Sequence, residues 1–100
     1  MTVGIVLEFP GGDDEAQARI GEAVRAQFGD APGPEGSLFH AEGKTVSGDW
    51  CMVEIWESRE ALARWQTGGL MTALQQAGVP MRSPTHMTMF DVQQLSIVDH

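Results

Sequence analysis

The chain has 100 residues, of which 42% are hydrophobic and 20% are charged, a composition typical of one folded domain. Fourteen acidic against six basic residues give a net charge of -8, which disfavours nucleic acid and anionic membrane surfaces as partners. No apolar run approaches the roughly 18 residues that span a bilayer. The single cysteine, Cys51, excludes an internal disulfide and fits a reducing compartment. We therefore expect one acidic cytoplasmic domain covering residues 1–100.

The first half of the chain predicts a strand, a helix and a second strand. Residues 2–9 are β-branched and apolar and run into a proline–glycine breaker, which indicates a strand. Acidic residues then open the segment 13–28, in which apolar side chains recur every four residues, as on one face of a helix. After a stretch rich in proline and glycine, residues 37–42 predict a strand and residues 43–49 a hairpin connection.

The second half predicts a strand, a helix and a further strand. Residues 50–56 are the most apolar run of the chain. Ser58 is a suitable N-cap for the next helix, which the glycines at 68 and 69 interrupt. A strand is expected over residues 85–92, and the apolar residues of the tail at 93–100 are interpreted as an additional edge strand.

This order, β-α-β-β-α-β, predicts an α+β fold of the ferredoxin-like type, with an antiparallel sheet and helices on one face. The strand at 50–56 is apolar on both of its faces, which indicates a sheet covered on both sides. The two sets of side chains are Cys51, Val53 and Ile55 on one face and Trp50, Met52 and Trp56 on the other. Since two helices cover only one face, we expect a homodimer with sheets packed face to face.

The segment 50–58, which ends in Ile-Trp-Glu-Ser before a helix, resembles the third strand of the dimeric α/β-barrel superfamily. Within that superfamily it is most similar to antibiotic biosynthesis monooxygenase-like (ABM-like) proteins. The element order and the sequence Met89-Phe90-Asp91 in the last strand also fit, so the resemblance covers nearly the whole chain. It implies a dimeric α/β barrel, and a family of cofactor-free oxygenases, polyketide cyclases and haem-degrading enzymes.

The cofactor-independent anthrone oxygenases of this superfamily provide the first residue-by-residue comparison. Their tryptophan falls on Trp56 of this chain. Their asparagine falls on Met52, their tyrosine on Leu62 and their arginine near Gln76. One of the four pocket roles is therefore retained, and the three polar roles are not.

The cyclases and the haem-degrading branch provide two further comparisons. The cyclase histidines fall on Val3 and Trp50, while an acid near the end of the last strand is kept as Asp91. The axial histidine of the haem-degrading enzymes falls on Gln75, and an iron needs that nitrogen. We therefore expect no haem and no other cofactor.

The resemblance also implies which strand positions face a common cavity, because successive side chains of a strand point to opposite faces. The expected lining from the strands is Val3, Ile5, Leu7, Phe9, Trp50, Met52, Glu54, Trp56, Met87, Met89 and Asp91. Leu62 and Trp65 from the second helix are expected as further walls. Such an apolar, aromatic slot suits a flat hydrophobic molecule, while the same aromatic residues alternatively form packed core.

Glu54 and Asp91 are the candidate catalytic residues. A carboxylate in the middle of an apolar strand is a candidate general base. The structural alternative for Glu54 is a bond to a backbone amide or to Arg82. Asp91 either forms an acid–base pair with Glu54 or accepts backbone hydrogen bonds at the end of its strand.

The histidines show no metal-ligand spacing, so we expect no metal site. His86 lies on the strand face opposite Asp91, which points toward the dimer interface. The direction of His40 is left open, and a surface or interface position is expected for both histidines. Cys51 has no adjacent histidine to activate it and is expected to be inert.

The resemblance and the predicted slot together favour a small-molecule enzyme of secondary or catabolic metabolism. Its expected substrate is hydrophobic and enolisable or phenolic, similar to a polyketide, and its expected type is a cofactor-independent monooxygenase or cyclase. Glu54 or Asp91 would remove a proton, leaving an enolate or phenolate against Trp56. The alternatives are a non-catalytic dimeric binder of a hydrophobic metabolite and a structural dimer whose slot is filled core.

Overall fold

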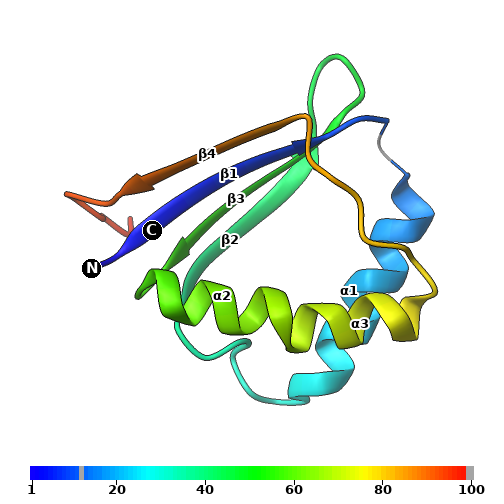
Figure 1. Cartoon of the computed structure of the whole chain (residues 1–100), viewed down its shortest axis with the longest axis horizontal. Coiled ribbons are helices and arrows are strands. Elements are labelled where there is room, and N and C mark those ends of the chain that lie inside the picture. The colour runs from blue at the N-terminus through cyan, green and yellow to red at the C-terminus, as the bar shows by residue number, and fades with distance from the viewer. Residues whose placement is uncertain (12, 99–100) are drawn as a thin grey trace.

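The computed structural model describes residues 1–11 and 13–98, and this part of the chain forms four strands and three helices (Figure 1). In chain order they are β1 (Val3–Phe9), α1 (Asp14–Phe28), β2 (Ser37–Lys44), β3 (Trp50–Trp56), α2 (Arg59–Thr67), α3 (Gly69–Ala77) and β4 (His86–Asp91). The predicted order is confirmed, and the fold is α+β of the ferredoxin-like type. The second helix of the pattern is divided into α2 and α3.

The four strands form one antiparallel sheet in the order β2-β3-β1-β4. β3 and β1 are therefore the central strands, and β2 and β4 are the edges. The helices all lie on one face of this sheet, and the segment after α3 crosses back to β4 (Figure 1). Helices and sheet thus form two layers, as the strand pattern predicts.

Local sequence signals explain where the helices begin and break. The side chain of Asp13 accepts a hydrogen bond from the Ala16 amide, and that of Ser58 accepts one from the Ala61 amide, so both helices carry an N-cap. Gly68 separates α2 from α3, and a side chain at this position would place its Cβ only 2.9 Å from the Arg64 carbonyl oxygen. The predicted interruption at the two glycines is thereby confirmed. Within the described residues, no helix is long and apolar enough to cross a membrane.

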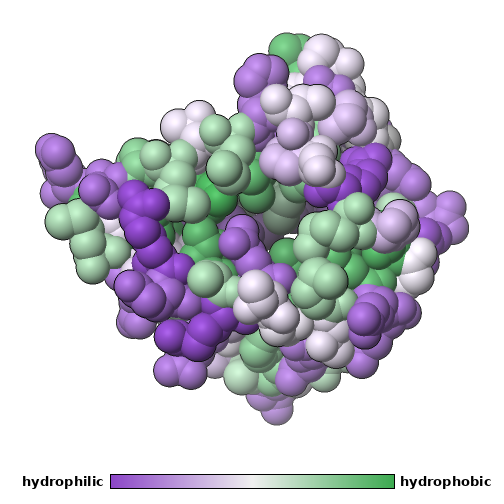
Figure 2. Space-filling model, viewed as in Figure 1, coloured by the Kyte–Doolittle hydropathy of each residue, from purple (hydrophilic) through white to green (hydrophobic). Residues whose placement is uncertain are grey.

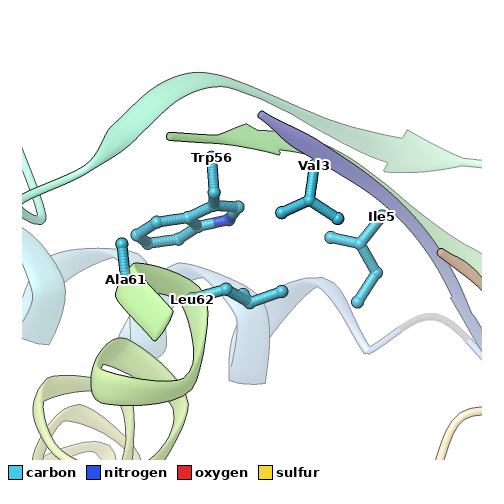
Figure 3. Close-up of a cluster of buried hydrophobic side chains, with 5 residues drawn as sticks. All are labelled: Val3, Ile5, Trp56, Ala61 and Leu62. Carbon is cyan, nitrogen blue, oxygen red and sulfur yellow. The ribbon is translucent and has the colours of Figure 1, made fainter. Parts of the chain in front are cut away.

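The hydrophobic core lies at the end of the sheet that α2 covers. Figure 3 shows Val3 and Ile5 of β1 and Trp56 of β3 facing Ala61 and Leu62 of α2, and all five are buried. α1 packs chiefly against α3 rather than against the sheet. The other half of the space between the layers is consequently not filled by α1.

The face of the sheet away from the helices carries apolar side chains without a covering layer. Phe39, Ile55, Gly4 and Phe90 follow one another across β2, β3, β1 and β4. Phe39 is 44% exposed and Phe90 is 45% exposed. The ring of Phe90 lies over Gly4, where any side chain would collide with it. We call this row the open face.

The tail departs from the prediction of an additional edge strand. Residues 93–98 form no strand, and residues 99 and 100 of that prediction lie outside the described residues. The Val92 amide donates to the Thr2 carbonyl and so completes the pairing of β4 with β1. No tight-turn sequence follows that would return the chain along the free edge of β4, and the apolar tail residues remain exposed.

Candidate functional site

A cavity of about 350 Å³ lies between the sheet and the helix layer, in the half that the core does not fill. Its apolar walls include Leu7 and Phe9 of β1, Met52 and Trp56 of β3, and Trp65 and Leu70 of the helices. The segment between α3 and β4 closes a further side with Val79–Arg82. Figure 2 shows the molecule hollowed between the two layers, with hydrophobic residues around the hollow. The interpretation of the slot as filled core is therefore wrong.

Three ionisable side chains on the sheet form a polar group at the wall of this cavity. His40 Nδ1 lies 2.9 Å from Glu54 Oε2, and His40 Nε2 lies 2.9 Å from Glu42 Oε2. The indole Nε1 of Trp56 donates to Glu54 Oε1 at 3.1 Å. Glu54 is thus held from two strands, and only 10% of its side chain is exposed. We call His40, Glu42 and Glu54 the carboxylate–histidine group.

A register irregularity in β2 explains why this group comes together. Ser37 lies opposite Trp56 and Phe39 lies opposite Ile55, so one extra residue is accommodated between them. Beyond this bulge His40 lies opposite Glu54 and Glu42 lies opposite Met52. His40 and Glu42 therefore share the cavity face. A sequence pattern alone does not locate a bulge, and the direction of His40 stayed open for this reason.

The two carboxylates determine the charge of His40. They raise its pKa to about 10, with the hydrogen bond to Glu42 as the largest cause and that to Glu54 as the next, against an opposing effect of burial. At neutral pH His40 is therefore an imidazolium, which donates from both ring nitrogens to the carboxylate oxygens. Such charge-assisted hydrogen bonds hold the Glu54 carboxylate in a fixed orientation at the cavity wall.

Several residues expected to line a pocket do line this cavity. They are Leu7, Phe9, Met52, Glu54, Trp56 and Trp65. Glu54 has the strand position that the pattern predicts, but its side-chain partners are His40 and Trp56 rather than the Arg82 of the structural alternative. Polar residues that line the cavity without having been expected there are His40, Glu42, Arg25, Arg82, Gln17, Gln66 and Ser37.

The other expected lining residues lie elsewhere. Val3, Ile5 and Leu62 belong to the packed core, and Trp50 and Met87 are not part of the lining. Met89 accepts a hydrogen bond from Arg59 on its sulfur, and Asp91 pairs with the same guanidinium at 3.3 Å. The partner of Asp91 is thus neither Glu54 nor a backbone amide, the two alternatives from the sequence, but the Arg59 side chain, because β4 is an edge strand and its end faces α2.

The two histidines have different surroundings. His86 is exposed on the open-face side, where its Nδ1 lies 3.4 Å from Glu8 Oε2. His40 also has the expected surface position, since its side chain is 43% exposed, and that side chain at the same time lines the cavity. Among residues 1–11 and 13–98, no group of three or more His, Cys, Asp or Glu side chains is arranged to hold a metal ion.

The chain is a small α+β protein with one antiparallel sheet, helices on one face of it and a cavity between these two layers. No protein-family model matches the chain, and no curated protein sequence is significantly similar to it. Solved structures are similar over almost the full length, however, and several of them carry the name antibiotic biosynthesis monooxygenase. The chain has the fold of the ABM-like proteins, as the resemblance of the segment 50–58 implies.

Three of these structures illustrate the similarity. Rv0793 from Mycobacterium tuberculosis has a TM-score of 0.62 at 15% identity, over 97% of this chain and 100% of its own. A candidate antibiotic biosynthesis monooxygenase from Chloroflexus aurantiacus has a TM-score of 0.65 at 13% identity, with 97% and 99% covered. SnoaB, a cofactor-independent oxygenase from Streptomyces nogalater, has a TM-score of 0.60 at 17% identity, with 94% and 95% covered. Identities this low establish the fold, and the activity has to be argued from the residues.

Proposed function

We propose that this chain is a cofactor-independent enzyme, of monooxygenase or cyclase type, acting on a hydrophobic, enolisable or phenolic small molecule. The observation that carries the proposal is the Glu54 carboxylate, nearly buried, at the wall of an apolar cavity of about 350 Å³. Pockets of this size with few, convergent polar groups are typical of small-molecule sites. SnoaB has the same fold and is a cofactor-independent oxygenase, which supports this choice among reaction types.

The walls of the cavity favour a flat substrate similar to an aromatic polyketide. Phe9 and Trp65 line it with partly exposed rings, so an aromatic ring system has ring faces and edges to pack against, while Trp56 lies buried behind the wall. Met52 adds a flexible thioether that adapts to an irregular outline. A hydrophobic substrate is thereby desolvated next to Glu54.

Glu54 is the proposed general base. Its oxygens each accept one hydrogen bond, from His40 and from Trp56, and a carboxylate oxygen has a second lone pair that remains for a substrate proton. Removal of a proton from an acidic C–H or O–H group gives an enolate or phenolate next to the Glu54 side chain, whose orientation the Trp56 indole N–H helps to fix. His40 acts as a positioning residue, since its imidazolium fixes the carboxylate. Asp91 receives no role, because its carboxylate pairs with Arg59 outside the cavity lining.

The resulting anion has two productive fates. In the monooxygenase reaction, dioxygen oxidises an activated CH₂ group to a ketone, with one oxygen atom entering the product and the other leaving as water. In the cyclase reaction, the carbanion attacks a carbonyl group of the same molecule and closes a ring, with no change in oxidation state. Proton removal by Glu54 is common to both.

A non-catalytic binder of a hydrophobic metabolite is the second candidate. The observation that favours it is that both ring nitrogens of His40 and both oxygens of Glu54 already have protein partners. A group so fully paired also fits a purely structural role at the wall of a binding cavity. Binding without turnover distinguishes this candidate from the enzyme.

We further propose that the protein is a cytoplasmic homodimer in which the open faces of two sheets pack together. Phe39 and Phe90 are large apolar side chains left partly exposed on this face. A second copy would cover the same residues on both subunits, as an interface around a two-fold axis does. The single cysteine of the chain fits a reducing compartment.

The experiment uses anthrone, which has an enolisable CH₂ group between two aromatic rings, as the probe substrate. Oxygen uptake and the appearance of anthraquinone are followed for the wild type, Glu54→Gln and Glu57→Gln, the last being an exposed carboxylate just beyond β3. We expect Glu54→Gln to lower kcat by roughly 100-fold or more, with anthrone affinity retained, and Glu57→Gln to have no effect. Unchanged turnover in Glu54→Gln would exclude the proposed base. Binding of anthrone and a panel of polyketide-like phenols without turnover of any would favour the binder.

A further inference from the structure

We propose that Arg25 and Arg82 form an anion-binding site at the cavity, which holds a carboxylate carried by the apolar ligand. The inference rests on the proposed function only in that the cavity binds a small molecule. It requires no catalytic step. The two guanidinium groups come from different elements, α1 and the segment between α3 and β4, and both residues line the cavity.

The distribution of basic residues is the first argument. Three of the six are in ion pairs with acidic neighbours, namely Arg19 with Glu15, Lys44 with Asp14 and Arg59 with Asp91. The other three are Arg25, Arg64 and Arg82, and none of them has an ion-pair partner within residues 1–11 and 13–98. Two of these three line the cavity. In a chain of net charge -8, arginines left without a carboxylate at one cavity indicate an external anion.

The position of Arg25 depends on a glycine one helical turn earlier. A Cβ at Gly21 would lie 3.3 Å from Nη1 and 3.8 Å from Nη2 of Arg25, so the guanidinium lies back over Gly21. Gly21 itself lines the cavity. A glycine in the middle of a helix is unfavourable relative to alanine, and here its missing side chain provides the room for the arginine head group.

The position of Arg82 depends on an aromatic ring. Its guanidinium carbon lies 6.0 Å from the centre of the Phe9 ring, within the range of a cation–π interaction. Phe9 is part of the cavity wall, and so the charge of Arg82 is held at that wall. A guanidinium in this position presents N–H donors in the planar arrangement that matches a carboxylate.

The charge of the lining indicates a monoanion. The ionisable lining residues are Arg25, Arg82, His40, Glu42 and Glu54. With His40 as an imidazolium these groups leave one net positive charge, in contrast to the negative charge of the whole chain. A carboxylate neutralises that charge, whereas a phosphate dianion would bring an excess negative charge close to two carboxylates. The apolar walls then accommodate the hydrocarbon part of the ligand.

The test compares naphthalene-2-carboxylate with the neutral naphthalene-2-carboxamide, which has nearly the same shape, by isothermal titration calorimetry at neutral pH. The variants are the wild type, the double variant Arg25→Gln/Arg82→Gln, and Arg64→Gln as a matched control outside the cavity lining. We expect the wild type to bind the carboxylate about tenfold more tightly than the amide, as charge-assisted hydrogen bonds at an exposed rim allow. The double variant loses this preference with amide affinity unchanged, and Arg64→Gln keeps it.

Gly21→Ala provides a second variant in which stability and binding move in opposite directions. Alanine brings a Cβ to 3.3 Å from Nη1 of Arg25, so the guanidinium has to shift slightly, while helix propensity rises; we therefore expect somewhat weaker carboxylate binding in a protein that is not destabilised. Equal affinity for carboxylate and amide in the wild type would overturn the anion site and leave the cavity as a binding site for neutral molecules. A preference that persists in the double variant overturns the assignment to these arginines. Absence of binding of either probe overturns both the anion site and the proposed ligand cavity.

Discussion

His40 on β2 and Glu54 on β3 occupy opposite positions of an antiparallel strand pair, and their side chains meet with 2.9 Å between Nδ1 and Oε2. The second ring nitrogen of His40, Nε2, lies at the same distance from Glu42 Oε2. One imidazolium therefore bridges a nearly buried carboxylate and a more exposed one. Burial of an unpaired carboxylate is costly, and this pairing explains how Glu54 is retained in an apolar wall.

The stability of the protein is expected to depend on the protonation of His40. Because the pKa of His40 is raised from 6.5 to about 10, its contribution to stability is fully present below about pH 6.5 and is lost as the pH rises through about 10. The difference in the free energy of unfolding between the wild type and His40→Gln should therefore shrink steadily over this range. Urea denaturation of both proteins at pH 6, 8 and 10 measures it. An equal difference at all three pH values would contradict the prediction.

The two carboxylates are expected to affect His40 unequally. The hydrogen bond to Glu42 is the larger cause of the raised pKa, although Glu42 is the more exposed partner. In Glu42→Gln the titration midpoint of the His40 ring, followed by NMR, should move from about 10 toward 6.5. A His40 midpoint unchanged in Glu42→Gln would assign the effect to Glu54 alone.

Most of the fold could be predicted from the sequence, because its signals are local. The run 50–56 has the same bounds in the structure, Ser58 caps α2, and Gly68 separates α2 from α3. The prediction of an edge strand in the tail was wrong for a physical reason. Apolar residues such as Leu95 and Ile97 suggest a strand, but a strand also needs a neighbouring strand with which to pair. That neighbour is a property of the tertiary fold and not of the segment.

The site was predictable only in part. The alternation along β3 placed Glu54, Met52 and Trp56 on the cavity face. The place of His40 in the cavity wall was not predicted, because one extra residue in β2 reverses the alternation of its side chains. The sequence of residues 37–42 contains no signal for that bulge. Asp91 has the parity expected of a cavity residue, but parity says nothing about how far along the sheet a cavity extends.

The contact of Gly4 with Phe90 predicts a specific loss of stability. In Gly4→Ala the new Cβ collides with the Phe90 ring, and such overpacking costs about 1–3 kcal/mol. The cost should be smaller when alanine is introduced into a Phe90→Ala background, since the ring is then absent. Gly43→Ala is the matched control, because a Cβ there has no atom within 4 Å, and we expect a change within about 0.5 kcal/mol. Urea denaturation measures the free energy of unfolding of the wild type, the two single variants, the double variant and the control. An equal cost of Gly4→Ala in the wild-type and Phe90→Ala backgrounds would disprove the contact.

The proposed dimer predicts that a charge on the open face separates the subunits. Phe90 is 45% exposed, and a face-to-face dimer would bury the Phe90 ring of each subunit. Phe90→Lys should therefore weaken dimerisation by about thirtyfold or more, the effect of losing a central apolar contact, because two lysines are then desolvated together. Val46→Lys, at a fully exposed position in the β2–β3 connection, is the control and should leave the dimer intact. Sedimentation velocity over a range of concentrations measures both, and a wild type that stays monomeric at every concentration rules the dimer out.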